Sequence, residues 1–461
     1  MRLFNTAGSR LEEFVPLHPG KVGMYCCGPT VHDRAHIGNF RTFLFEDILY
    51  RYLIYKGYDV HYVMNITDVD DKTILKSRKQ KLSLREYTDI YTQAFFEDRD
   101  TLRILPANQY PRATDHIPEM IEMTQKLLEK GYAYKSHDSV YFRITALPDY
   151  GKLSGLDKQD LIDGYRVDSD EYTKESPKDF VLWKGRRDDE DYWDAPFGPG
   201  RPGWHLECSV MSIKYLGIPI DIHAGGVDLI FPHHENEIAQ SEAAYGQTFV
   251  HYWLHSAHLQ VEGEKMAKSK GNFFTVRELI EEGHDPLVLR YMLMSVHYRK
   301  QLNFSDESLM QAKGALGRLK DFLYRLHSDS FSEGRSNEVE GILSKARKTF
   351  EESLDDDLNI SGALGALFEM IYQLNKIGDK GQIGAQDVPA IEALVRKMDQ
   401  VLAVASFPET TISDEIETLI QKRNEARRKK DFKAADEIRD RLLAQGIVLE
   451  DTPGGTRWKK S

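Results

Sequence analysis

The sequence has few cysteines, no long apolar segment and no overall excess of positive charge. Its three cysteines, at positions 26, 27 and 208, are too few for a disulfide framework, which excludes the small disulfide-stapled secreted class. No apolar run reaches about 18 residues, and the N-terminus resembles neither a secretory signal nor an organellar transit peptide. We therefore expect a soluble, cytoplasmic protein with no membrane association, whose thiols are free or metal-bound.

Charge and length limit the function further. A formal charge of -12 argues against indiscriminate nucleic-acid binding over the whole surface. Residues 419–461 differ, because twelve Lys and Arg stand there against seven Asp and Glu, a balance of +5. A chain of 461 residues is too long for one core, so we expect roughly two to four domains and, by default, a monomer.

A βαβ unit is predicted near the N-terminus. Residues 21–27 form a β-favouring run that ends at a Gly-Pro turn, residues 38–56 carry apolar side chains at helical spacing, and residues 59–65 again favour a strand. Ligands of parallel sheets bind beyond the carboxyl ends of the strands, where Cys27 and Gly28 would lie beside the helix start. The pattern therefore favours an α/β, Rossmann-like fold.

The rest of the chain is expected to extend this fold. A mixed helix and hairpin region interrupts the sheet, a strand over 218–223 with a helix opening at Pro232 resumes it, and amphipathic helices follow. The expected domains are the first half of the Rossmann-like domain (1–110), an insertion (111–200), its second half (201–253), a lysine-loop and stem-contact region (254–305), a helical bundle (306–405) and a small C-terminal domain (412–461).

The first chemical motif is His36-Ile37-Gly38-Asn39, at the predicted strand-to-helix junction. An imidazole and an amide donor beside the free N–H groups of a helix start can bind polyphosphate oxygens. Gly38 would let a flat ring approach the backbone closely. The four residues would serve equally as a plain helix start, so the motif alone leaves both interpretations open.

The second motif is the lysine-rich segment Lys265-Met266-Ala267-Lys268-Ser269. Two lysines three positions apart on a loop can meet the charge that develops on a leaving pyrophosphate. A solvated surface loop is the alternative. Together the two motifs resemble the HIGH and KMSKS signatures of class I aminoacyl-tRNA synthetases, which implies that both segments bind ATP.

Longer segments make the resemblance specific. They are CCGPTVHDRAHIGNFR, NITDVDDK, RPGWHLECS, GGVDLIFPHHENEIAQSEAA and KMAKSKGNFF. Together they are similar to cysteinyl-tRNA synthetases over nearly the whole chain. The resemblance implies a cysteine-tRNA ligase with L-cysteine, ATP accompanied by magnesium, and cysteine tRNA as its partners. It implies catalytic roles for His36, Asn39, Lys265 and Lys268.

Two positions depart from the class I signatures. Asn39 replaces the second histidine of HIGH, and Ala267 replaces the first serine of KMSKS. Asparagine still donates a hydrogen bond to a phosphate oxygen but cannot become cationic. Both lysines remain, so we expect ATP activation to survive.

A zinc site is implied by the same resemblance. His233 and Glu237 stand four apart on a predicted helix and share one face, where both can bind a single ion. Neighbours on a strand point to opposite faces, so Cys26 and Cys27 cannot both reach that ion. We expect Cys26 to be a small buried residue and His234 to point elsewhere as a helix-start residue. The resemblance implies one zinc ion, bound by Cys27, Cys208, His233 and Glu237.

The expected use of this zinc is selection of the substrate. Cysteine and serine differ only by sulfur for oxygen, and a hydrophobic pocket separates such near-isosteres poorly. A thiolate binds zinc directly, whereas a hydroxyl is a poor substitute. Trp204 is expected to wall the pocket, with a core tryptophan as the alternative, and Asp228 to contact an amine or ribose, with helix capping as the alternative. The resemblance implies substrate contacts for Gly28, Thr30, Thr67, Trp204 and Asp228.

The basic tail supplies the RNA interpretation. Cations at 427–430, followed by Phe432 and by Trp458 near the end, place charge beside aromatic rings that could stack on unpaired bases. A merely solvated helix face is the alternative. By resemblance this is the anticodon-binding domain, and its candidate contacts are Arg427, Phe432, Asp436 and Asp451.

Two alternative functions remain open beside the ligase interpretation. One is a related enzyme that joins activated cysteine to an amine of a sugar-like acceptor, although such relatives lack the tail present here. The other is a catalytically dead, zinc-bearing RNA-binding paralogue, which only the two departures from the signatures support.

Overall fold

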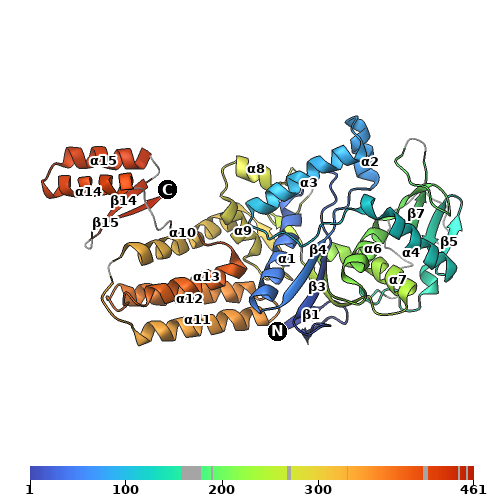
Figure 1. Ribbon diagram of the computed structural model, residues 1–461, viewed down its shortest axis with the longest axis horizontal. Coiled ribbons are helices and arrows are strands. Elements are labelled where there is room, and N and C mark those ends of the chain that lie inside the picture. The colour runs from blue at the N-terminus through green and yellow to red at the C-terminus, as the bar shows by residue number, and fades with distance from the viewer. Residues whose placement is uncertain are drawn as a thin grey trace. The chain divides into compact units, whose positions relative to one another are not determined.

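A parallel sheet organises the first part of the chain in the computed structural model (Figure 1). Its strands are β3 (Lys21–Cys26), β4 (Asp59–Met64), β9 (Ile220–Gly226) and β10 (Val250–Ser256), in the order β10-β9-β3-β4. The chain crosses from β3 to β4 through α1 (Ile37–Tyr55). The predicted βαβ unit is therefore confirmed, and the β3–β9 neighbourhood is the point where the strand order changes direction, a preferred place for ligands.

The structure describes residues 1–156, 178–187, 190–266, 271–329, 331–408, 414–444, 447–452 and 455–460. These residues fall into two units. One comprises residues 1–309 and 353–360, and the other comprises residues 310–352 and 361–461.

Two helices cover opposite faces of the sheet, α1 on one side and α6 (Trp204–Leu216) on the other. Cys26 lies beside Glu46 of α1, whereas Cys27 lies 3.8 Å from Cys208 of α6, measured between the sulfur atoms. Successive strand residues point to opposite faces. The prediction that Cys26 and Cys27 diverge is therefore confirmed.

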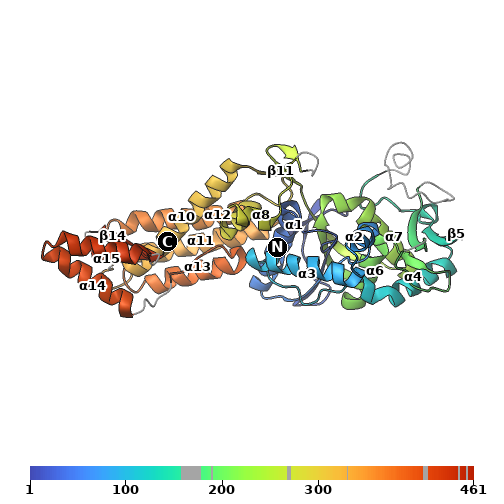
Figure 2. The ribbon, with the colours of Figure 1, turned by 90° about the horizontal axis from the view of Figure 1, so that it is seen from above.

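A large connection links β4 to β9. The hairpin predicted near residue 133 is confirmed, because β5 and β6 pair in antiparallel fashion and continue into a sheet with β7 and β8. Helices α4, α6 and α7 (Glu235–Tyr245) lie side by side (Figures 1 and 2). The elements are α2 (Asp71–Lys79), α3 (Leu84–Thr101), α4 (Ile117–Glu129), β5 (Ala133–Ser136), β6 (Ser139–Phe142), β7 (Phe180–Gly185) and β8 (Gly200–Pro202).

The return from β9 to β10 differs from the sequence expectation. Helix α7 spans Glu235–Tyr245 and does not open at Pro232. An irregular turn, Ile230–His234, precedes it, and within this turn Phe231 has an extended backbone (φ -135°, ψ 132°). An extended residue interrupts helical geometry, so the side chains of the turn leave the backbone in directions that a regular helix would not give them.

Short elements complete the first unit. An antiparallel pair stands at the N-terminus, and a small three-stranded sheet adjoins the lysine-rich segment. These elements are β1 (Arg2–Asn5), β2 (Arg10–Glu13), β11 (Leu259–Val261), β12 (Glu264–Lys265), α8 (Val276–Glu281), α9 (Pro286–Met294) and β13 (Leu302–Phe304).

Helices then dominate, as the apolar periodicity predicts. They are α10 (Asp306–Ser328), α11 (Asn337–Asp355), α12 (Ile360–Gly378) and α13 (Val388–Leu402). Nearer the C-terminus, α14 (Asp414–Arg428) and α15 (Phe432–Ala444) pack with the hairpin of β14 (Ile447–Thr452) and β15 (Gly455–Lys460) around Leu419, Ile420, Leu442 and Ile447. None of the described helices combines the length and the apolar character of a membrane span.

Candidate active site and metal-ligand cluster

A cavity of about 510 Å³ opens beyond the carboxyl ends of the parallel strands. Residues that follow β3, β4, β9 and β10 line it, as expected for a crevice at such a sheet edge. The predicted site residues among its lining are Cys27, Gly28, Thr30, His36, Gly38, Asn39, Thr67, Trp204, Cys208, Asp228, His233 and Met266. Residues predicted to bind a metal and residues predicted to bind phosphate thus share one cavity.

Gly28 lies where the chain leaving β3 passes the chain leaving β4. A Cβ atom at this position would stand 1.7 Å from the carbonyl oxygen of Asn65, so no larger residue fits without backbone movement. The Gly28 N–H donates to Asn65 Oδ1 (2.8 Å), and Asn65 Nδ2 donates to Thr67 Oγ1 (3.1 Å). Asn65, which the sequence analysis missed, therefore orients the Thr67 hydroxyl at the cavity wall.

The four predicted metal ligands come together. Donor atoms of Cys27, Cys208, His233 and Glu237 all lie within 4.8 Å of one another, and all four residues are buried. Glu237 Oε1 is 3.0 Å from His233 Nε2 and 3.9 Å from Cys27 Sγ. Residues separated by up to 210 positions therefore converge through the sheet and the two helices that pack on one face of it.

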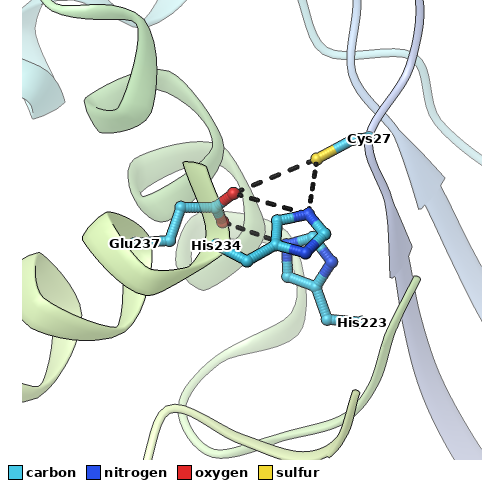
Figure 3. A group of neighbouring side chains, drawn as sticks. All are labelled: Cys27, His223, His234 and Glu237. Atoms are coloured by element: carbon cyan, nitrogen blue, oxygen red, sulfur yellow. Dashed lines mark hydrogen bonds and ion pairs between the residues drawn. The ribbon is translucent and has the colours of Figure 1, made fainter. Parts of the chain in front are cut away.

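A second set of donors overlaps the first. Cys27, His223, His234 and Glu237 also lie with their donor atoms within 4.8 Å of one another (Figure 3). His234 Nε2 is 3.3 Å from Cys27 Sγ, and His223 Nε2 is 2.9 Å from Glu237 Oε2. The expectation that His234 points away is wrong, because the irregular turn before α7 directs both adjacent histidines toward Glu237.

A buried chain of hydrogen bonds orients His234. Its Nδ1 is 2.8 Å from His255 Nε2, and His255 Nδ1 is 2.7 Å from the Thr6 hydroxyl. The hydroxyl can donate or accept as the tautomers require. His234 is thereby fixed with Nε2 toward Cys27.

The electrostatics of the cluster follow from crowding of oppositely charged groups. Burial alone would raise the pKa of Glu237, but His223 and His233 lower that pKa to about 2. Burial would lower the pKa of His233, yet Glu237 and Cys208 raise it to about 10. Although burial opposes it, hydrogen bonds with Cys27 and His233 lower the pKa of the Cys208 thiol to about 6. The protein thus favours the anionic forms of two of its donors.

The donor set fits zinc. Two sulfurs, an imidazole and a carboxylate form the soft, mixed set that Zn²⁺ accepts. Zn–S bonds of about 2.3 Å in tetrahedral geometry put two sulfurs about 3.8 Å apart, which is the 3.8 Å observed between Cys27 and Cys208. Two considerations therefore favour the Cys27, Cys208, His233 and Glu237 set. It offers two sulfurs, and it leaves His223 to bond the second oxygen of Glu237, as a partner of a ligating carboxylate does.

Trp204 and Asp228 lie at the cavity in exposed or half-buried positions. The Trp204 ring lies 4.1 Å from the His233 ring, between centroids, and the residue is 39% exposed. The core-tryptophan alternative is therefore wrong. Among the described residues, the Asp228 side chain makes no helix-capping hydrogen bond, which removes support for the capping alternative.

His36 and Asn39 form a reciprocal cap at the start of α1. Asn39 N–H donates to His36 Nδ1 (3.2 Å), and His36 N–H donates to Asn39 Oδ1 (3.1 Å). Both side chains also line the cavity, so the helix-start and ligand-site interpretations describe the same geometry. Ile37 is fully buried and is not part of the cavity lining.

The lysine-rich segment is described only in part. Met266 lines the cavity, and its methyl group lies where a Cβ on Gly38 would meet it, 2.9 Å away. Lys265 belongs to β12. Ala267, Lys268 and Ser269 lie outside the described residues.

The candidate RNA contacts occupy the C-terminal elements. Arg427 lies near the end of α14, and Phe432, which begins α15, is 61% exposed. Asp436 pairs with Arg439 at 3.5 Å, and Asp451 belongs to β14.

Solved structures share the fold at low sequence identity. A methionyl-tRNA synthetase from Mycobacterium tuberculosis, bound by methionyl-adenylate, superposes with a TM-score of 0.61 at 16% identity, covering 83% of this chain and 88% of that chain. A leucyl-tRNA synthetase from Agrobacterium radiobacter, in a ternary complex with tRNA, gives 0.61 at 12% identity, covering 85% of each chain. These likenesses establish a class I synthetase fold.

Other relatives share much more of the sequence than these solved structures do. Residues 13–314 match the family model described as tRNA synthetases class I (C) catalytic domain, residues 349–406 match the DALR domain, and residues 409–458 match the cysteinyl-tRNA ligase anticodon binding domain. A cysteine--tRNA ligase from Brachyspira hyodysenteriae is 48% identical, covering 99% of this chain and 98% of that relative. Another from Chlamydia felis is 50% identical, with 99% and 97% covered. The chain therefore belongs to the cysteinyl-tRNA ligase family of class I aminoacyl-tRNA synthetases.

Proposed function

We propose that the protein activates L-cysteine with ATP to cysteinyl-adenylate and transfers the cysteinyl group to the 3′-terminal ribose of cysteine tRNA, selecting the substrate by its thiol. One observation carries this proposal. Three of the four donor residues, Cys27, Cys208 and His233, line the same cavity as His36 and Asn39, and Glu237 lies buried against them. Cysteine and ATP can therefore be bound side by side, as adenylate formation requires.

Cys27, Cys208, His233 and Glu237 would hold a zinc ion, which supplies a direct bond to the substrate thiolate. His223 holds Glu237, and His234 holds Cys27, so that neither ligand is free to rotate away. Trp204 covers the imidazole of His233 and narrows this end of the cavity. Serine would gain much less from the same arrangement, since its hydroxyl is far less acidic than a thiol.

The remaining lining residues would place the reacting groups. Thr67, oriented by Asn65, would help to bind the amino acid, and Asp228 would contact the substrate amine or the ribose. Gly28 and Thr30 would shape the cavity wall. His36 and Asn39 would donate to phosphate oxygens at the start of α1, where the helix dipole favours anions. Lys265 and Lys268, with their loop, would stabilise the charge of the leaving pyrophosphate.

The C-terminal domain would read the tRNA. Phe432 is exposed at a helix start, where its ring can stack on an unpaired base, and Arg427, Asp436 and Asp451 would supply charged and hydrogen-bonding contacts. The domain boundaries given above, with an insertion at 111–200, belong to the same proposal.

The test is transfer of labelled cysteine to purified cysteine tRNA, with serine assayed in parallel and with the variant Lys268→Ala. We expect charging with cysteine and not with serine, and a loss of about 100-fold or more in kcat for the variant. Cysteine-dependent exchange between ATP and pyrophosphate without charging would indicate a different acceptor. Absence of both activities would indicate the inactive RNA-binding paralogue.

A further inference from the structure

The α2 helix and the turn after it carry cations that the proposed chemistry does not use. From Lys72 to Arg85 the sequence contains six Lys and Arg and no Asp or Glu, in a chain whose formal charge is -12. Figure 1 shows α2 at the edge of the first unit, next to α3. A purely cationic segment on an acidic protein is a candidate surface for a polyanion.

The cations form a strip along the helix. Lys72, Lys76 and Lys79 are separated by four and three positions, so they share one face of α2 over about 10 Å. Leu75 lies on the same face and is 54% exposed. Arg78 and Lys81 are also exposed. We call Lys72, Lys76, Arg78, Lys79 and Lys81 the α2 strip.

Most of this charge is uncompensated. The nearest acid in the sequence, Asp71, is already bound by Arg201 and Lys184. Within the strip, Lys76 pairs with Asp33 at 3.1 Å. Among the residues that the structure describes, Lys72, Arg78, Lys79 and Lys81 form no ion pair, so four positive charges face solvent without a partner carboxylate there.

The strip begins at the cavity. Lys72 lines the cavity together with Arg34, whereas Arg78, Lys79 and Lys81 are not part of that lining. The strip therefore runs from the rim outward. An RNA whose terminal ribose accepts an acyl group inside the cavity has to thread its preceding phosphates past this rim.

We propose that the α2 strip binds the backbone phosphates of the unpaired 3′ end of the tRNA and guides that end into the cavity. This inference rests on the proposed ligase function and locates one part of its RNA surface. Lysines provide sequence-independent point charges, and phosphate contacts of this kind position an RNA without reading its bases. Leu75 offers an apolar surface beside these charges, against which a sugar or base can pack.

The test is the triple variant Arg78→Gln/Lys79→Gln/Lys81→Gln of the full chain, which leaves every cavity-lining residue unchanged. Cysteine-dependent exchange between ATP and pyrophosphate should stay within about twofold of the wild type, since adenylate formation does not involve RNA. The kcat/KM for tRNA charging should fall by about tenfold, mainly through KM. Its dependence on salt should weaken, with the slope of log kcat/KM against log salt concentration smaller by about 2 for three lost phosphate contacts.

A matched control removes three exposed cations elsewhere on the first unit, in the variant Lys21→Gln/Lys135→Gln/Lys300→Gln. It carries the same change of net charge and should leave both the charging rate and the salt slope within about twofold of the wild type. Equal losses in the two triple variants would show a nonspecific charge effect and overturn the proposal. An unchanged charging rate, or parallel losses of exchange and charging, would overturn it too. Absence of exchange in the wild type would contradict the proposed function instead.

Discussion

Two buried glutamates on opposite faces of one sheet behave in opposite ways. Glu46 and Glu237 are both fully buried, and each lies beside one of two consecutive cysteines, Cys26 and Cys27. Burial raises the pKa of Glu46 well above its usual value and outweighs the opposing effect of Cys26. By contrast, His223 and His233 overcome burial and lower the pKa of Glu237 to about 2.

The comparison shows that the neighbours of a buried carboxyl group decide its charge. A buried carboxyl without a cation keeps its proton, because ionisation in a poorly polarisable interior costs several kcal/mol. The same group among imidazoles ionises and can become a metal ligand. On the α1 side of the sheet Glu46 is thus neutral beside Cys26, whereas on the other side Glu237 belongs to a cluster of charged donors that fits a metal ion.

Replacing each glutamate by glutamine should give the largest difference in zinc content and activity between the two faces of the sheet. Glu237→Gln removes the carboxylate that His223 and His233 contact. We expect its zinc content to fall well below one ion per chain and kcat/KM for cysteine to fall by more than about a hundredfold. Glu46→Gln should retain zinc, with activity within about twofold of the wild type. Metal analysis with exchange kinetics tests both, and zinc loss in Glu46→Gln alone would reverse the assignment of the faces.

The two cysteines offer a second, matched exchange. Cys27→Ser should lose most of its bound zinc, because a hydroxyl does not replace a thiolate ligand. Cys26→Ser should keep its zinc and lose only stability, by about 1–3 kcal/mol, since a hydroxyl is then buried beside the neutral Glu46. Thermal unfolding and zinc stoichiometry of the pair provide the measurement. Retention of full zinc by Cys27→Ser would rule this residue out as a ligand.

Positioning of Cys27 by His234 can be weakened without removing a ligand of the favoured set. His234→Gln breaks the chain from Thr6 through His255 to the Cys27 thiol. Loss of a partner that orients a ligand lowers metal affinity by about 10- to 100-fold. Competition with a chromophoric chelator measures this, and the exposed His61→Gln serves as the matched control. Complete loss of zinc in His234→Gln would instead indicate that His234 itself is a ligand.

The smallest expected effect concerns pH and Glu46. Because its pKa is raised in the folded state, folding retains a proton that the unfolded chain releases. The corresponding stability is fully present below the unfolded pKa and is lost as pH rises toward the folded pKa, by at most about 1.4 kcal/mol per pH unit. The melting temperature of Glu46→Gln should therefore decline less than that of the wild type between about pH 5 and 8. Parallel declines would show that Glu46 does not retain its proton.

Local patterns in the sequence predict the fold around the site well. Strand alternation separates Cys26 from Cys27, and turn and helix signals give β3, α1 and β4 to within about one residue. These features depend on neighbours along the chain, which is why they are visible without a structure.

Local sequence patterns do not predict the histidines that complete the donor cluster. A regular helix separates adjacent side chains and would turn His234 away from the cluster, whereas the extended Phe231 interrupts that geometry. His223 and His255 enter through the pairing of distant strands, which no local pattern records. For α2 the cationic run is plain in the sequence, but only the structure places Lys72 at the cavity.

The most direct test of the central claim, that the cluster at the cavity wall selects cysteine through its sulfur, is optical. Cobalt(II) would be substituted for zinc in the full-length protein, and the absorption spectrum recorded before and after addition of cysteine or serine. A third sulfur bound beside Cys27 and Cys208 should intensify the thiolate-to-metal absorption with cysteine and leave it unchanged with serine. Identical spectra with both amino acids would contradict the account.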